Sequence, residues 1–104
     1  MLNQSVLVGR LTKDPEIRQT SDGKQVSTIS LAVQRNFKSQ ETGEYETDFF
    51  RCTLWEGMAE STVQYCKKGS TIAVKARLAT KRFLYDDEKY FEYPEIVVEK
   101  ISFM

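Results

Sequence analysis

The segment Ser70–Phe83, STIAVKARLATKRF, separates into two faces when it is read as a β-strand. Successive side chains of a strand point to opposite sides of the sheet. One row is apolar and fit to cover a core: Ile72, Val74, Ala76, Leu78 and Thr80. The other row combines cations, small residues and one ring: Thr71, Ala73, Lys75, Arg77, Ala79, Lys81 and Phe83. A solvent face with positive charge and an exposed ring suits a partner that carries phosphates and flat bases.

Length and composition indicate one ordinary domain. The 104 residues match the usual size of a single domain, and the hydrophobic fraction of 40% and charged fraction of 29% are typical of soluble proteins. No apolar run approaches the roughly 20 residues that span a bilayer. The N-terminus, MLNQSVLVGRL, lacks a cationic start followed by a long apolar stretch, so no secretory signal is expected. These features predict a cytoplasmic protein without membrane contacts.

The distribution of charge is more informative than its sum. Fifteen basic and fifteen acidic residues cancel, which by itself argues against a nucleic-acid partner. However, residues 61–85 contain no acid, and the acids gather in residues 41–48, 86–88 and 92–99. A neutral chain can therefore hold a basic face, whose binding should be local and salt-sensitive. The cations of the acid-free segment are Lys67, Lys68, Lys75, Arg77, Lys81 and Arg82.

The residue types leave little room for metal or catalytic chemistry. Cys52 and Cys66 are the only cysteines and there is no histidine, so zinc has too few soft ligands. We expect two reduced, buried thiols and no cofactor. Glycine-rich phosphate loops and nucleophile elbows are missing. Asp14, Asp48 or Glu56 could pair around a metal, as in nucleases, but their spacing does not single them out. The sequence thus predicts a protein that is not an enzyme.

The first half of the chain reads as three strands. Residues 3–11 are apolar on both faces around Val6–Val8, which fits a strand buried on both sides or paired across a subunit boundary. Residues 21–24 form a turn, and residues 26–35 alternate cleanly, as a half-buried antiparallel strand does. We expect a long hairpin loop over residues 36–46, with Phe37 near its base.

The third strand, residues 47–55, again has two unlike faces. One face is apolar: Phe50, Cys52 and Leu54. The other face mixes rings with a cation: Phe49, Arg51, Thr53 and Trp55. As in the segment 70–83, one face covers a core and the other suits a ligand.

The second half holds one helix and two strands. Residues 56–66 predict a helix that buries Ala59, Val63 and Cys66 at i, i+4 and i+7, with Met58, Thr62 and Tyr65 alongside; Lys67 and Lys68 suit its negative end, and Gly69 its C′ position. A charged tip at residues 85–89 separates the strand 70–83 from a last strand at 90–103. Pro94 cannot donate to a sheet, so the front of that last strand must be an edge or a bulge.

The resulting order predicts an all-β fold with one helix. Five strands with a helix between the third and fourth describe the OB-fold, a five-stranded Greek-key β-barrel that often binds oligonucleotides on its second and third strands. A ferredoxin-like fold needs a helix after the first strand, where residues 12–24 are turn-like.

Exposed rings among cations are the pattern for unpaired nucleic acid. Every base offers a flat face, so stacking needs no sequence match, while cations follow the phosphates. A duplex hides its base faces, so exposed rings favour single strands. The rings outside the core rows are Phe37, Phe49, Trp55 and Phe83, and the cations that would follow the phosphates are Arg51, Lys75, Arg77 and Lys81. Each ring taken singly could instead be a core-edge residue or a subunit contact.

Four further rings have two open interpretations. They either extend the stacking surface along the hairpin or cover hydrophobic neighbours. These rings are Tyr85, Tyr90, Phe91 and Tyr93.

These residues resemble the bacterial and phage single-stranded DNA-binding proteins. The similarity covers the opening NQSVLVGRLTKDPEIRQTSDGKQVSTISLAVQR (3–35), the middle EYETDFFRCTLWEGMAESTVQYCKKGSTIAVKARLATKRF (44–83) and the close EIVVEKISFM (95–104). It implies an OB-fold that assembles as a homotetramer and wraps single-stranded DNA without sequence preference.

The resemblance also assigns individual positions. It implies stacking at Phe37, Phe49, Trp55 and Phe83, and phosphate contacts at Arg51, Lys68, Lys81 and Arg82. Three of these rings are Phe where relatives often have Trp, and Trp55 stands where Phe is common. The family's basic residue after the third strand is Gly57 in this chain. Arg82 directly follows Lys81, so in a strand the two side chains point to opposite faces. Arg82 can therefore join the binding surface only if residues 80–90 project from the barrel as an arm.

The resemblance further implies roles in DNA replication, recombination and repair, close to the nucleoid. Family members usually continue into a glycine- and proline-rich tail that recruits other proteins, whereas this sequence ends at Met104. We therefore expect residues 1–104 to form a single DNA-binding domain without a C-terminal tail, and recruitment of replication and repair proteins stays open. The alternative function is a protein-interaction or replication-restart module whose aromatic rows form subunit contacts. DNA and RNA are not distinguished by the residues.

Overall fold

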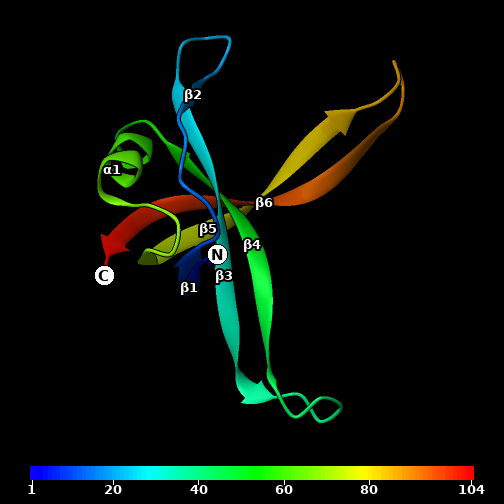
Figure 1. Cartoon of the computed structure of the whole chain (residues 1–104). Coiled ribbons are helices and arrows are strands. Elements are labelled where there is room, and N and C mark those ends of the chain that lie inside the picture. Colours follow the sequence, from blue (N-terminus) through cyan, green and yellow to red (C-terminus); the bar gives the residue numbers. More distant parts are fainter.

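A computed structural model, which describes residues 1–104, contains one sheet that closes on itself and a single helix (Figure 1). The elements in chain order are β1 (Ser5–Leu11), β2 (Arg18–Gln19), β3 (Gln25–Lys38), β4 (Tyr45–Trp55), α1 (Gly57–Tyr65), β5 (Thr71–Leu84) and β6 (Tyr90–Phe103). The sheet order is β1-β5-β6-β4-β3-β2, and an additional β1–β3 pairing closes the barrel. The predicted OB-fold is confirmed, with β2 as a two-residue addition beside β3.

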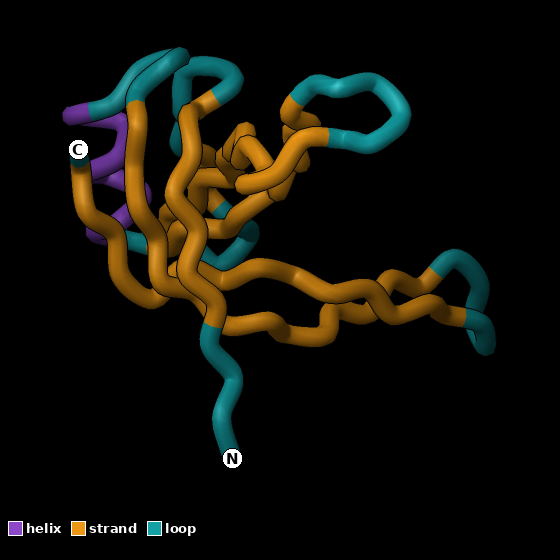
Figure 2. Tube along the Cα trace, turned by 90° about the horizontal axis from the view of Figure 1, so that it is seen from below, coloured by secondary structure: helices purple, strands orange, loops and turns teal.

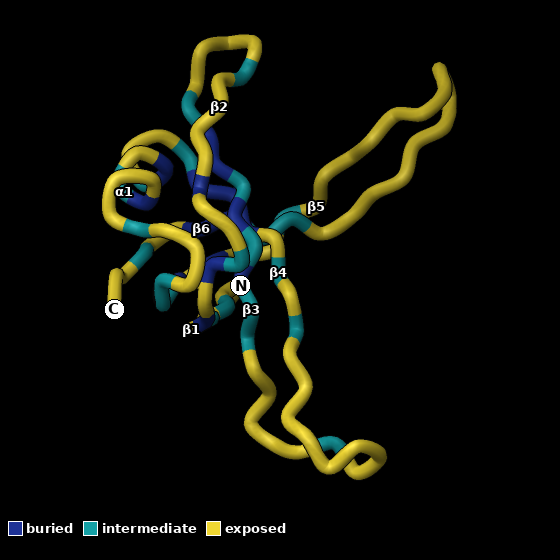
Figure 3. Tube along the Cα trace, viewed as in Figure 1, coloured by how far each residue is buried: buried dark blue, intermediate teal, exposed yellow.

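Two hairpins extend beyond the barrel (Figures 1 and 2). We call residues 35–48 the β3–β4 arm and residues 79–95 the β5–β6 arm. Almost every residue of both arms is exposed, in contrast to the buried centre of the barrel (Figure 3). The projection predicted for residues 80–90 is therefore confirmed. The predicted loop over residues 36–46 is too long, because β3 and β4 stay paired as far as Lys38 and Tyr45. Backbone hydrogen bonds extend a hairpin without any need for apolar side chains.

The core lies inside the barrel and takes residues from β1, β3, β4, β5, β6 and the helix. Its nine buried members are Leu11, Ile29, Leu31, Cys52, Leu54, Ala59, Ile72, Val74 and Val98. The apolar row predicted for β5 is correct through Ala76, which is fully buried. It is wrong for Leu78, which is 50% exposed, and for Thr80. The reason is that β1 pairs with β5 only up to Ala76, so beyond this point β5 leaves the barrel.

An asparagine side chain stabilises the point where β5 leaves the barrel. Asn3 Nδ2 donates to the Leu78 carbonyl oxygen at 2.6 Å, and the Leu78 N–H donates to Asn3 Oδ1 at 2.9 Å. The amide thereby replaces the backbone partner that β1 no longer provides to β5.

The apolar segment of β1 is not buried on both sides. Leu7 packs against the core, whereas Val6 is 64% exposed and Val8 is 50% exposed. Of the two predicted environments, burial on both sides is wrong for the isolated chain. The glycine at position 9 of β1 is required by the close approach of β1 to β3. A Cβ there would lie 2.6 Å from the Ala32 carbonyl oxygen, so a larger residue would force the strands apart.

The helix is confirmed, but its buried face differs from the prediction. Ala59 and Thr62 are buried, whereas Val63 is 36% exposed and Cys66 is only half-buried. Thr62 is tolerated inside because its Oγ1 donates to the Met58 carbonyl oxygen at 2.7 Å. Burial raises the pKa of the Cys52 thiol to about 11 and also raises the pKa of Cys66.

Two backbone predictions, one for the end of the helix and one for a position within β6, have opposite outcomes. The C′ position predicted for Gly69 is wrong, since the helix ends with Cys66 as its cap and Gly69, at φ +90°, belongs to a separate turn. The Ser70 N–H closes that turn on the Lys67 carbonyl oxygen at 2.9 Å. The edge position predicted for Pro94 is confirmed, because in the arm β6 pairs only with β5. No helix is long and apolar enough to cross a membrane.

Candidate nucleic-acid interface

A groove of about 410 Å³ lies between the outer face of β4, the β2–β3 edge and the base of the β5–β6 arm. Because Cys52 and Leu54 point into the core, the alternating residues Arg51, Thr53 and Trp55 must point outwards into this groove. The charged residues and rings that line it are Arg18, Arg51, Trp55, Lys81, Tyr93 and Glu95. The groove thus combines three cations and two rings with one carboxylate.

The four predicted stacking rings are all accessible, but they do not form one cluster. Phe49 is 66% exposed and belongs to the same outer row of β4 as Arg51 and Trp55. Trp55 is half-buried at the end of that row. Phe37 is 67% exposed on the β3–β4 arm, and Phe83 is 52% exposed on the β5–β6 arm. The rings therefore follow a path from one arm across β4 to the other arm.

The predicted cations fall into two groups. Arg51 and Lys81 line the groove, and Arg51 also borders a smaller hollow beside Asp14. Lys75 and Arg77 are exposed outside the groove; Lys75 lies opposite Val6 of β1 and Lys100 of β6.

The other two predicted cations lie on separate surfaces. The Lys68 backbone N–H donates to Asp14 Oδ1 at 2.7 Å, which places Lys68 beside the smaller hollow. Arg82 is on the face of the arm opposite Phe83, where it contacts Glu92 at 3.3 Å and covers the Tyr90 ring at 4.0 Å. The parity argument placed Arg82 on this opposite face correctly.

Strand pairing brings acids to the basic segment. The prediction treated the outer face of residues 70–83 as free of acids, which is true only along the chain. In the sheet, Glu95 Oε2 of β6 lies 3.2 Å from the Lys81 Nζ. The side chain of Glu95 is only 18% exposed, so this carboxylate partly neutralises Lys81 within the groove.

A second ionic cluster lies on the β3–β4 arm. Arg35 donates to both carboxylate oxygens of Asp48 at 3.0 Å and to Glu46 Oε2 at 2.8 Å. Hydrogen bonding and charge from these carboxylates raise the pKa of Arg35, and Arg35 lowers the pKa of Asp48. This bidentate geometry holds the two strands of the arm together and leaves Arg35 little affinity for a phosphate.

Sequence reasoning missed Arg18 and left Tyr93 undecided. Both line the groove. Tyr93 lies directly opposite Lys81, a position that follows from folding the two strands symmetrically about the tip at residues 85–89. Arg18 belongs to the two-residue strand β2, which has no periodic pattern to reveal which way its side chains point.

Two of the three carboxylates considered for a metal, Asp14 and Asp48, are engaged elsewhere. Asp14 accepts the Lys68 N–H, and Asp48 pairs with Arg35. No group of three or more His, Cys, Asp or Glu side chains in residues 1–104 could hold a metal ion. The geometry therefore offers the nuclease alternative no support.

Comparison with known proteins identifies the family. The model of the single-strand binding protein family matches residues 2–104. The chain belongs to this family. The resemblance noted in the sequence is thus confirmed, and the family is one of binding proteins rather than enzymes.

Individual relatives cover the whole chain. It is 43% identical over 104 residues to single-stranded DNA-binding protein B of Bacillus subtilis (strain 168), covering 100% of this chain and 91% of that protein. It is 45% identical to single-stranded DNA-binding protein 3 of Listeria innocua serovar 6a, again over 100% of this chain but 64% of that protein. The single-stranded DNA-binding protein of Bacillus cereus is 43% identical, and the chain spans 61% of its length.

Proposed function

We propose that this protein binds single-stranded DNA without sequence specificity, by stacking bases on exposed rings and contacting phosphates with cations. The observation that carries the proposal is the groove in which Arg51, Lys81 and Trp55 converge beside the exposed Phe49. Stacking contributes roughly 1–3 kcal/mol per base whatever its identity, and phosphate contacts release counterions. A duplex would present no base face to these rings.

The path of the rings supports a division of roles. Phe37, Phe49, Trp55 and Phe83 stack bases, and Arg51 and Lys81 hold the phosphates that pass through the groove. The cations outside the groove hold phosphates further along the strand: Lys68, Lys75 and Arg77. Arg82 has only a minor part, because it lies on the far face of the β5–β6 arm, where the Glu92 carboxylate competes with a phosphate for it. Residues 1–104 act as one binding domain, since the rings come from both arms and from the barrel between them.

The same activity supports a biological role and an assembly. Coating unpaired strands protects them during DNA replication, recombination and repair. The bacterial relatives support a cytoplasmic location, and the proposed binding to unpaired DNA would place the protein near the nucleoid. A homotetramer is supported by the exposed Val6 and Val8 on β1, an apolar strip that a second subunit could cover.

Trp55 is the only tryptophan and therefore reports binding directly. Titration with oligo-dT of increasing length should quench its fluorescence, with an affinity that falls as salt rises and a plateau that gives the site size. Competition with oligo-U separates DNA from RNA preference. Unchanged fluorescence together with no retention of labelled oligo-dT at low salt would exclude the proposal. A protein that sediments as a dimer and ignores oligo-dT would instead favour the protein-interaction module.

A further inference from the structure

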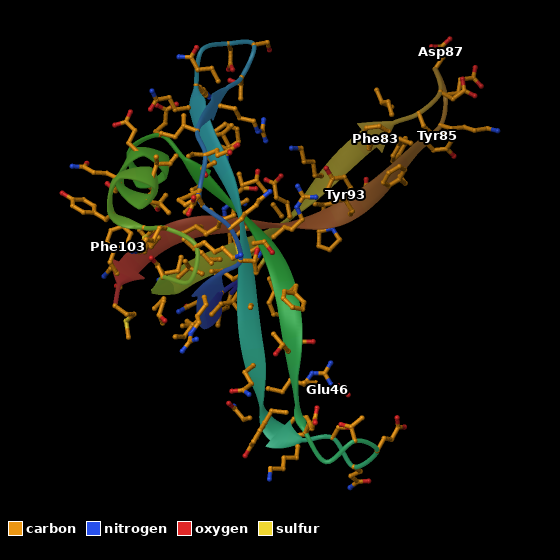
Figure 4. All side chains as sticks on the ribbon, viewed as in Figure 1. Glu46, Phe83, Tyr85, Asp87, Tyr93 and Phe103 are labelled. Atoms are coloured by element: carbon orange, nitrogen blue, oxygen red, sulfur yellow. The ribbon has the colours of Figure 1, made fainter.

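The β5–β6 arm carries exposed rings that contact one another along one face. Phe83 and Phe91 lie directly opposite each other with ring centroids 5.3 Å apart. Phe91 also contacts Tyr93 at 6.0 Å and Tyr85 at 6.1 Å. We call Phe83, Tyr85, Phe91 and Tyr93 the arm row. Figure 4 shows its order, with Tyr93 near the base of the arm, then Phe83, then Tyr85, and Asp87 at the tip.

The register of the hairpin determines which way this row faces. Residues directly opposite each other in an antiparallel pair share a face. Because Lys81 pairs with Tyr93 and both line the groove, the arm row faces the same side as the groove. The other face of the arm carries Leu84, Tyr90 and the Arg82–Glu92 pair. One face therefore continues the groove, and the other turns away from it.

The arm row has no core to cover. Its rings are between 38% and 60% exposed, on a hairpin that projects from the barrel. Contacts between neighbouring rings stabilise the hairpin, but they leave the outer ring faces in water. Tyr90 on the opposite face differs in this respect, because the Arg82 guanidinium already covers its ring.

We propose that the arm row is a stacking platform for unpaired bases, continuous with the groove, in which Tyr85, Phe91 and Tyr93 add to the stacking position already assigned to Phe83. A strand that leaves Trp55 and Arg51 meets Tyr93 first and then the Phe83–Phe91 pair. This inference rests on the proposed function and extends its site. The rings already pack against one another, so little side-chain entropy is lost when a base stacks on them.

Charge favours nucleic acid as the occupant and sets the limit of the platform. The base of the row adjoins three cations of the groove, Arg18, Arg51 and Lys81. Its outer end adjoins Asp86, Asp87 and Glu88, which repel phosphates. The strand therefore leaves the arm before its tip, so Phe91 and Tyr93 should contribute more than Tyr85.

Leucine substitutions separate stacking from folding, because leucine keeps apolar packing and removes the aromatic face. Phe91→Leu and Tyr93→Leu are compared with Tyr90→Leu, a matched control on the opposite face of the same strand. Affinity is measured by Trp55 fluorescence with oligo-dT and oligo-U of several lengths, and thermal unfolding checks the fold. Phe91→Leu and Tyr93→Leu should each weaken binding of long oligomers by roughly 5- to 150-fold. Tyr90→Leu should change the affinity by less than about twofold, because Arg82 already covers the Tyr90 ring and no base stacks on it.

The results distinguish the inference from the function on which it rests. If the wild-type chain binds oligo-dT and the Phe91 and Tyr93 variants bind equally well, the arm row is not a stacking platform, although the proposed function stands. An equal loss of affinity in Tyr90→Leu also overturns the inference, because the loss would then not depend on which face of the arm carries the ring. If the row variants change only the sedimenting mass, the row is a contact between copies of this chain. A wild-type chain that binds no oligomer removes the function itself.

Discussion

The two arms use different chemistry to solve the same structural problem. A two-stranded hairpin is marginally stable on its own, so each arm needs cross-strand side-chain contacts once it leaves the barrel. The β3–β4 arm uses the ionic cluster of Arg35, Glu46 and Asp48. The β5–β6 arm uses the contacting rings of the arm row, with ion pairs beside them. The difference has a functional consequence: ion pairs consume the charges that bind phosphate, whereas packed rings still present their faces to a base.

The largest expected effect is a loss of oligo-dT affinity when an exposed ring is removed, and its size should differ between the two arms. Phe83→Ala should weaken oligo-dT binding by roughly 1–3 kcal/mol through loss of a stacked base, and Phe49→Ala on β4 should have a similar effect. Phe37→Ala should cost less, because the hollow beside Phe37 also contains the carboxylates of Glu41 and Glu46, which repel a phosphate backbone. Fluorescence titration of Trp55 measures all three. A larger loss for Phe37→Ala than for Phe83→Ala would reverse the assignment of the two arms.

A smaller effect, of opposite sign, tests the carboxylate in the groove. Glu95→Gln removes the partner of Lys81 and should strengthen oligo-dT binding. One additional released counterion steepens the dependence of log K on log salt by about 0.7 for a single strand. Glu46→Gln is the matched control on the other arm, because Arg35 keeps both hydrogen bonds to Asp48. An unchanged salt slope in Glu95→Gln would mean that Lys81 does not contact phosphate.

The smallest expected effect is a pH-dependent change in the local stability of the β3–β4 arm. Arg35 lowers the pKa of Asp48 below its ordinary value of 3.8, so the pair stabilises the β3–β4 arm fully above that value. The contribution is lost as pH falls through the lower pKa of the folded state. The protection factors of amide hydrogen exchange, which are corrected for the intrinsic effect of pH, should therefore fall in the β3–β4 arm at acid pH before they fall around the arm row. Asp48→Asn should lower the protection of the β3–β4 arm at neutral pH, and equal behaviour of both arms would contradict the ionic role.

Local patterns account for much of the fold. The period of two in residues 26–35, 47–55 and 70–76 is a property of each strand alone, so it predicts the core faces without knowledge of neighbours. The same alternation, broken by rings and cations, predicts the outward row of Phe49, Arg51 and Trp55. A single helix between two strands is likewise visible from composition and turn signals, and together these elements leave the OB-fold as the matching topology.

Other features depend on which segments become neighbours, and no local pattern contains that information. Leu78 is exposed because β1 has ended beside it, and the phase of the helix follows the barrel that it packs on. Glu95 reaches Lys81 only because β6 folds back along β5, which changes a basic segment into a partly neutralised one. The face of Tyr93 also follows from this pairing. Residue types and their alternation thus determine the strands, the rings and the cations, whereas strand pairing decides which of them share a groove, since pairing joins residues far apart in the chain.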